Sequence, residues 1–191
     1  MQTKAIIFDC FGVLVTDGWL PFRDKYFGGS PELREQAAMH NTMVDKGLMS
    51  YEDFIQWLVE TTGVPLPEVQ RQITGNKPNE PLFTYIRDQL APRYHIGLLS
   101  NAGDNWLHDM LEPWQVALFE EAVLSYQLGV TKPDPLMYET IAARLGVLPE
   151  ECVFVDDQPR YCEGAKAIGM KAIHYQNTTQ SIAEMEELFD A

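Results

Sequence analysis

Short apolar runs alternate along the chain with longer stretches in which apolar residues recur at helical spacing. The runs are too short for helices and lack the alternation of a half-exposed strand, so each is typical of a strand buried on both faces of a parallel sheet. Strands that alternate with helices predict a parallel sheet with right-handed crossovers, and hence an α/β fold. The predicted strands are 5–8, 94–101, 122–126, 151–157 and 171–175.

The chain between the first two predicted strands is expected to be helical over residues 31–75. Ser30 precedes a Pro-Glu pair and Ser50 precedes an amphipathic stretch, and serine is a preferred helix N-cap. We therefore expect helices inserted between two strands of one sheet. Residues 16–21 have the composition of a turn and predict a small hairpin or flap. Further helices are predicted at 80–91, at 106–111, after Asp134, over a segment containing 165–169, and at 178–188.

The chain has 191 residues, of which 46% are hydrophobic, and a formal net charge of −14. These values fit a soluble globular protein, and the acidity argues against nucleic acid or an anionic membrane surface as a partner. We expect neither a signal peptide nor a membrane span, because no apolar run approaches the ~20 residues that a span needs. The cysteines are three in number and lack metal-ligand spacing, which favours a reduced, cytoplasmic compartment. Cys10 is expected to be a buried, inert thiol.

Chemically suitable side chains follow four of the predicted strands. Asp9 ends the first strand and Ser100 the second, Lys132 lies in a Pro-stiffened loop after the third, and Asp156 and Asp157 end the fourth. Because parallel strands end at one edge of a sheet, we expect these groups to converge there. They would supply a nucleophilic carboxylate, a hydrogen-bond donor, a fixed cation and a metal site, which is a set suited to phosphoryl transfer.

The adjacent acids Asp156 and Asp157 indicate a cation. Two carboxylates side by side repel each other, and the repulsion raises one of their pKa values unless a hard cation lies between them. Carboxylate oxygens together with retained water suit Mg²⁺. A bound divalent cation would also let this acidic protein accept an anionic, phosphorylated substrate.

Four segments, in this order and spacing, resemble the motifs of the haloacid dehalogenase superfamily. They are Phe8–Leu14, Leu99–Asn101, Lys132-Pro133 and Phe154–Asp157, and the resemblance runs from residue 5 to about residue 175. It is strongest to the subgroup that holds small sugar-phosphate phosphatases and the amino-terminal domain of soluble epoxide hydrolases. The resemblance implies a Rossmann-like, doubly wound core formed by 1–16 and 78–191, with a helical cap inserted at 17–77.

The resemblance also implies roles for single residues. Asp9 would be the nucleophile that forms an aspartyl-phosphate. Ser100, together with Asn101, would bind the phosphoryl oxygens. Lys132 would neutralise charge on the nucleophile and on the phosphoryl group. The substrate would be a small phosphorylated metabolite, with Phe11 and Trp19 as further residues in contact with it.

The metal site implied by the resemblance holds Mg²⁺. Its ligands would be the Asp9 carboxylate, the backbone carbonyl of Phe11 and the Asp157 carboxylate. Asp156 would contribute directly or through a water molecule.

One position departs from the pattern of the family's phosphatases. They carry a second Asp two residues after the nucleophile, as general acid and base, and this chain has Phe11 there. Such a group is worth ~10²–10⁴-fold in rate. The chain would then be a slow phosphatase that uses a surrogate acid such as Asp17 or substrates with good leaving groups.

Two alternatives stay open: a 2-haloacid dehalogenase, which also lacks that second Asp and uses no metal, and a degenerate relative that binds a phosphorylated metabolite. Asp156 and Asp157 favour the phosphatase over the dehalogenase. Without a metal, two acids beside the nucleophile would repel the carboxylate of a haloacid. The sequence identifies neither the substrate nor the oligomeric state. In the predicted cap, Trp19 and Phe22 are the best candidates for a substrate lid, because they lie outside the helical periodicity.

Overall fold

The computed structural model describes residues 2–190, and its centre is a five-stranded parallel sheet. The strand order is β3-β2-β1-β4-β5, so β1 lies in the middle with β2 and β4 on either side. Each of these strands overlaps one of the apolar runs that predict them. The bounds are Ala5–Phe8 for β1, His95–Ser100 for β2, Glu121–Leu124 for β3, Cys152–Asp156 for β4 and Lys171–His174 for β5.

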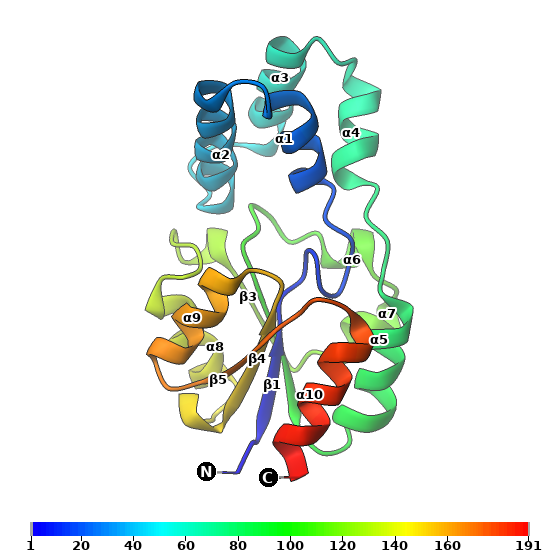
Figure 1. Cartoon of the computed structure of the whole chain (residues 1–191), viewed down its shortest axis with the longest axis vertical. Helices are drawn as coiled ribbons and strands as arrows, with labels where there is room; N and C mark the ends of the chain where they lie inside the picture. Colours follow the sequence, from blue (N-terminus) through cyan, green and yellow to red (C-terminus); the bar gives the residue numbers. More distant parts are fainter. Residues whose placement is uncertain (1, 191) are drawn as a thin grey trace.

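Helices cover both faces of the sheet, which is the doubly wound arrangement (Figure 1). Successive side chains of a strand point to opposite faces, so Ile6 and Phe8 pack into one hydrophobic cluster and Ala5 and Ile7 into another. The first cluster includes residues of α5, α6 and α10, and the second includes residues of α8 and α9. The bounds are α5 Glu80–Tyr85 (continued by the π-helical turn Ile86–Leu90), α6 Leu107–Met110, α7 Pro113–Val116, α8 Pro135–Arg144, α9 Pro159–Ala167 and α10 Thr178–Asp190. Short 3₁₀ turns lie at Ser125–Gln127 and Pro149–Glu151.

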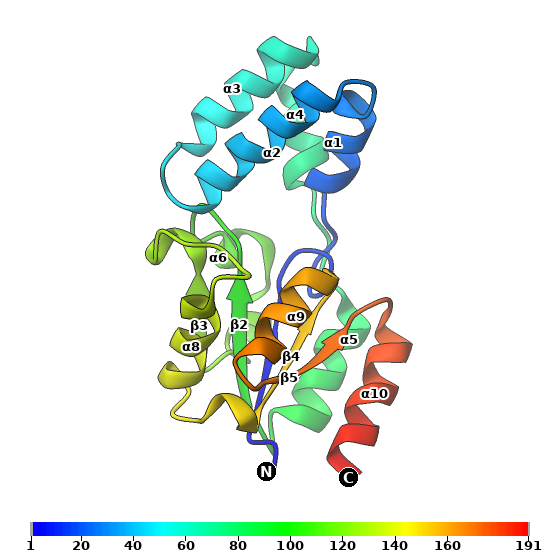
Figure 2. The ribbon, with the colours of Figure 1, turned by 60° about the vertical axis from the view of Figure 1, so that its left-hand side comes forward.

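The chain between β1 and α5 forms a separate helical layer, which is the predicted inserted cap (Figure 1). Its helices are α1 Trp19–Phe27, α2 Pro31–Asp45, α3 Tyr51–Thr62 and α4 Leu66–Thr74. They enclose their own core of buried apolar residues, distinct from the two clusters of the sheet. Ser30 and Ser50 cap α2 and α3 as expected, each accepting a backbone N–H bond. The rotated view shows this cap above the carboxyl ends of the strands, with both chain termini at the opposite end of the molecule (Figure 2).

The two segments that join the cap to the core run side by side. The Thr16 N–H donates to the Lys77 carbonyl over 3.0 Å, and the Lys77 N–H donates to Thr16 Oγ1 over 2.9 Å. The division into a core of 1–16 and 78–191 and a cap of 17–77 stays a prediction.

The prediction of a hairpin or flap at residues 16–21 is wrong, because α1 begins at Trp19. Asp17 Oδ1 accepts the N–H groups of Trp19 and Leu20 over 2.7 and 3.2 Å, which satisfies two of the donors that a helix start leaves unpaired. Phe22 then packs in the cap core with 1% of its surface exposed, so it is a core residue rather than part of a lid. The turn-like composition of the segment is that of a helix start.

No helix within residues 2–190 combines the length and the apolar character that crossing a membrane requires.

Candidate active site

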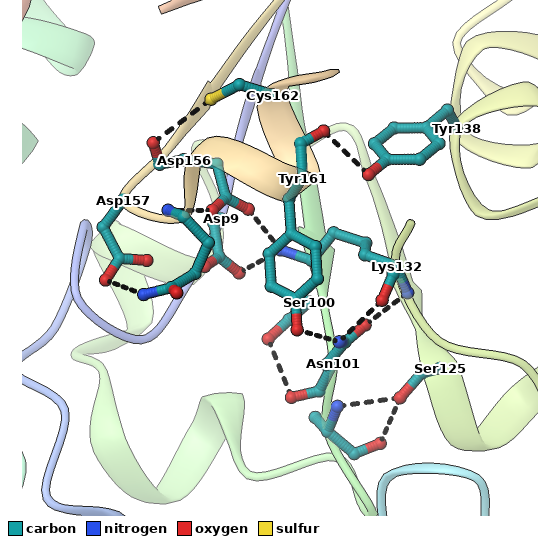
Figure 3. Close-up of polar contacts among 12 residues, drawn as sticks. Asp9, Ser100, Asn101, Ser125, Lys132, Tyr138, Asp156, Asp157, Tyr161 and Cys162 are labelled. Carbon is teal, nitrogen blue, oxygen red and sulfur yellow. Dashed lines mark hydrogen bonds and ion pairs between the residues drawn. The ribbon is translucent and has the colours of Figure 1, made fainter. Parts of the chain in front are cut away.

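A buried lysine connects two carboxylates at the carboxyl edge of the sheet. Lys132 Nζ lies 2.7 Å from Asp9 Oδ1 and 2.7 Å from Asp156 Oδ2. Figure 3 shows the ammonium reaching between the two acids. Asp9 follows β1, and its N–H donates to the carbonyl of Val155 on β4. The side chains of Lys132 and Asp156 are at most 1% exposed. Parallel strand ends thus bring together residues that are more than 120 positions apart in the sequence.

The third carboxylate, Asp157, completes an oxygen-rich cluster. One carboxylate oxygen from each of Asp9, Asp156 and Asp157 lies within 4.8 Å of the others. When all three carboxylates are ionised, the single ammonium of Lys132 leaves two negative charges uncompensated. Hard oxygen donors with that charge fit Mg²⁺. Gly12, at φ +86°, brings the backbone so close to this cluster that a Cβ there would lie 2.8 Å from the Asp157 Cγ.

Burial and charge act in opposite directions on these groups. Burial raises the pKa of Asp9 above its usual range, Lys132 lowers it, and the neighbouring acids raise it again. Burial by itself would lower the pKa of Lys132, but the carboxylates of Asp156 and Asp9 raise it above its usual range. Burial is also the main reason that the pKa of Asp157 is raised. The lysine is therefore charged, and the cluster is short of positive charge.

Asn101 holds the loop that carries Lys132. Its Oδ1 accepts the N–H of Lys132 over 2.8 Å, and its Nδ2 donates to the hydroxyl of Tyr161 over 3.2 Å. Ser100 is 1% exposed, and its Oγ donates to the Asn101 carbonyl over 3.5 Å, which is a weak bond. The structure thus places Asn101 against the lysine loop, while Ser100 lines a small second cavity with Cys10 and Phe11.

A cavity of about 580 Å³ lies between the core and the cap. Asp9, Lys132 and Asp157 line it from the core. The predicted substrate residues Phe11 and Trp19 line it as well. The Phe11 ring packs edge-on against Trp106, with the ring centroids 6.0 Å apart. The aromatic residues of the wall are Phe11, Trp19, Tyr51, Phe54, Trp106 and Tyr161, and its cationic side chains besides Lys132 are Arg23 and Arg160.

Several residues of the site carry no local sequence signal. Tyr161 lies on α9, with its ring centroid 5.0 Å from Lys132 Nζ, and covers the ammonium. Asp45 and Tyr51 lie on cap helices and line the same cavity as the nucleophile candidate. In the sequence they belong to ordinary amphipathic helices, so only the docking of the cap on the core brings them to the site.

Cys10 is 1% exposed, and burial raises the pKa of its thiol far above the usual range. It is the inert core thiol that the sequence predicts.

Comparison with known proteins agrees with this architecture. A model of the haloacid dehalogenase-like hydrolase family matches residues 3–169. The sesquiterpene phosphatase astK of Aspergillus oryzae is 26% identical over 97% of this chain and 96% of its own length. The bifunctional epoxide hydrolase 2 of Sus scrofa is 24% identical over 98% of this chain, which spans 39% of that larger protein.

Among solved structures, the wild-type HAD-family enzyme bt-2542 of Bacteroides thetaiotaomicron, in complex with magnesium and inorganic phosphate, has the same fold. The TM-score is 0.69 at 22% identity, over 94% of this chain and 98% of that one. The family match covers most of the chain and includes all four motif segments. The chain therefore belongs to the haloacid dehalogenase-like hydrolase family.

Proposed function

We propose that the protein is a Mg²⁺-dependent phosphomonoester hydrolase that works through an aspartyl-phosphate on Asp9. The observation that carries the proposal is the buried ammonium of Lys132 between two carboxylates, with a third beside them, on the floor of a cavity covered by the cap. Phosphoryl transfer depends mainly on positioning and on charge neutralisation, and this arrangement provides both.

The proposed reaction has two steps. An Asp9 carboxylate oxygen attacks phosphorus, the bond from phosphorus to the ester oxygen breaks, and the alcohol leaves with a proton. Water then attacks the phosphoryl group and releases inorganic phosphate and free Asp9. Lys132 favours the ionised form of Asp9 and orients it, and offsets negative charge that develops on the phosphoryl oxygens.

Mg²⁺ would be held by the Asp9 carboxylate, the Phe11 carbonyl and the Asp157 carboxylate. Bound there, it supplies charge neutralisation and aligns the phosphoryl group with the nucleophile. Both oxygens of Asp156 already accept hydrogen bonds, from Lys132 Nζ and from the Gln158 N–H over 2.7 Å each. We therefore propose that Asp156 orients the lysine and reaches the ion through water.

We also propose that Ser100 and Asn101 bind the phosphoryl oxygens; Asn101 lines the large cavity, whereas Ser100 lines the small second one. The weak bond of Ser100 Oγ leaves its hydroxyl free to turn toward a phosphoryl group. The two amide bonds of Asn101 support a second task for it, which is to hold Lys132 in place.

The substrate is proposed to be a small phosphate ester with a partly apolar organic group. The aromatic wall of the cavity supports this, because aromatic side chains contribute most of the binding energy to apolar groups. The name of the fungal relative, a sesquiterpene phosphatase, points in the same direction. A cytoplasmic location and the absence of nucleic-acid and membrane partners remain expectations from charge and composition.

The test is hydrolysis of p-nitrophenyl phosphate with and without Mg²⁺. We expect turnover that needs Mg²⁺ and is abolished by Asp9→Asn and by Asp157→Ala. The matched control is Asp134→Asn, because Asp134 is exposed, lies two residues beyond Lys132, and keeps a helix-capping side chain when it becomes Asn. It should turn over at the rate of the natural protein.

Three results would overturn the proposal. The first is an unchanged rate in Asp157→Ala, which would remove the metal assignment. The second is metal-independent release of halide from 2-haloacids without any phosphatase activity, which would identify a dehalogenase. The third is no turnover of either substrate class together with a higher melting temperature in a phosphorylated metabolite, which would identify a binding protein.

A further inference from the structure

We propose that Asp45 of the cap supplies the general acid and base that Phe11 cannot supply. This inference rests on the proposed phosphatase function and adds to it the residue that handles the proton. A proton donor at the leaving oxygen is needed for esters of ordinary alcohols, which are poor leaving groups.

Four carboxylic acids line the large cavity, and three of them have other tasks. Asp9 is the proposed nucleophile, and Asp157 belongs to the proposed metal site. Asp17 was the surrogate that the sequence suggested, but its Oδ1 accepts the two N–H groups at the start of α1. Burial raises the pKa of Asp17 and these two bonds lower it, so the pKa alone does not set Asp17 apart. The bonds do hold its carboxyl group at the start of α1, which gives Asp17 a structural task. Asp45 is left: its Oδ2 accepts one side-chain bond, from Asn41 Nδ2 over 2.9 Å.

The end of α2 is fixed to the core, which gives Asp45 a defined place above the site. The buried hydroxyl of Ser125 donates to the backbone carbonyl of Asp45 and accepts the N–H of Ala102 over 2.9 Å. Ala102 follows β2 and Ser125 follows β3, so α2 ends directly on the edge of the sheet that carries the site. Gly103 packs so closely under Val44 that a Cβ there would lie 2.4 Å from Val44 Cγ1. Asp45 is thus anchored at its backbone, and it is one of the residues that line the cavity.

The surroundings of Asp45 suit a group that both gives and takes a proton near neutrality. Burial raises the pKa of its carboxyl group to about 7, the ammonium of Lys132 lowers it, and the charge of Asp17 raises it. A general acid works best when its pKa lies near the working pH. The other ionisable side chains lining the cavity are Asp9, Arg23, Tyr51, Asp157, Arg160 and Tyr161.

The proton balance closes over the two steps. As Asp9 attacks phosphorus, the electron pair of the breaking P–O bond goes to the leaving oxygen, which takes the proton of Asp45. The Asp45 carboxylate then accepts a proton from the water that attacks the aspartyl-phosphate. Inorganic phosphate leaves, Asp9 is free, and Asp45 is protonated again.

Leaving-group dependence separates this role from a merely structural one. We would measure single-turnover release of the alcohol from p-nitrophenyl phosphate and from n-butyl phosphate, at saturating Mg²⁺. Asp45→Asn should lower release of butanol by ~10²–10⁴-fold. It should change release of p-nitrophenol by less than about tenfold, because that leaving group needs little protonation. Asp17→Asn, the control on a second cavity carboxyl group, should change both rates by the same factor.

Two further measurements make the test independent of one variant. Adding Phe11→Asp to Asp45→Asn should restore butanol release, since it returns an acid to the position two residues after the nucleophile. In the natural protein, butanol release should fall above about pH 7, and this fall should be absent in Asp45→Asn.

The inference would be overturned if Asp45→Asn slowed the release of both alcohols equally, or slowed neither. It would also be overturned if the natural protein hydrolysed p-nitrophenyl phosphate but not n-butyl phosphate. Failure of the proposed function itself looks different, because then the natural protein hydrolyses neither ester above the Asp9→Asn background.

Discussion

Replacing Lys132 by methionine tests whether its ion pairs hold the site together. The substitution keeps an unbranched side chain of similar length and removes an ammonium that lies 2.7 Å from each of two carboxylate oxygens. Asp9 and Asp156 are then buried without a counter-charge. Removing one partner of a buried ion pair costs about 3–5 kcal/mol, because the remaining charge stays desolvated.

We therefore expect the free energy of unfolding to fall by about 3–5 kcal/mol in Lys132→Met. For a domain of this size each kcal/mol corresponds to roughly 2–4 °C, so the melting temperature should fall by about 6–20 °C. The assay is thermal unfolding followed by circular dichroism, in buffer without divalent cations. In assays with Mg²⁺, phosphatase activity should fall as well, because the variant lacks the ammonium that orients Asp9 and offsets charge beside it.

Lys166→Met is the matched control. Lys166 pairs with Glu163 over 2.9 Å, but both side chains are at least half exposed. Exposed pairs of this kind contribute about 0–1 kcal/mol, so its melting temperature should barely change. If Lys132→Met melts within about 2 °C of the natural protein, the ion pairs of Lys132 contribute no more than exposed surface pairs do. That result would refute the idea that they hold the site together. Mg²⁺ should raise the melting temperature of Lys132→Met more than that of the natural protein, because the variant has one more uncompensated charge.

Three further outcomes are expected. Gly12→Ala should lower the free energy of unfolding by about 1–2 kcal/mol because of its positive φ, and it should weaken activation by Mg²⁺ because the new Cβ displaces Asp157. The control Gly129→Ala shares the positive φ but has no neighbour within 4 Å, so it should lose stability without any change in Mg²⁺ activation. Equal Mg²⁺ titrations of the two variants would contradict this. In urea titrations between pH 4 and 7, the natural protein should lose about 1.4 kcal/mol per pH unit relative to Asp45→Asn. The sign follows because a carboxyl group whose pKa rises on folding keeps its proton in the folded state and loses it in the unfolded state. A constant difference would exclude the raised pKa. Trp19→Ala should lower kcat/KM roughly 10–150-fold for phosphate esters with a large apolar group, and it should leave kcat/KM for glycerol phosphate unchanged. An equal loss of kcat/KM on both kinds of ester would argue against an apolar subsite.

The sequence determined the sheet and the residues at its carboxyl edge. Each buried strand is a short apolar run. Asp9 follows β1 directly, Ser100 and Asp156 end β2 and β4, and Lys132 lies in the loop after β3. In a parallel sheet all such ends meet at one edge, so four separate local patterns were enough to predict one site. The spacing of Lys132 and of the Asp156-Asp157 pair carries the same information, because each is tied to a strand or helix end next to it.

Only the tertiary structure decided how the cap contributes. Asp45 lies on an amphipathic helix whose pattern shows which face is apolar, but not where its end rests on the core. Its position depends on Ser125 and on the close contact beneath Val44, which involve residues about 60–80 positions away. The raised pKa of Asp45 has the same origin, because it arises from burial in a cavity that neither subdomain forms alone. The start of α1 is not predictable from its composition for a related reason. A turn-like composition does not reveal that Asp17 accepts the first N–H groups of a helix whose Phe22 and Phe27 are buried in the cap core. Local sequence determines which reactive side chains stand at the strand ends. Contacts between distant segments determine the shape of the cavity, how strongly its charged groups are buried, and which residue is placed to transfer the proton.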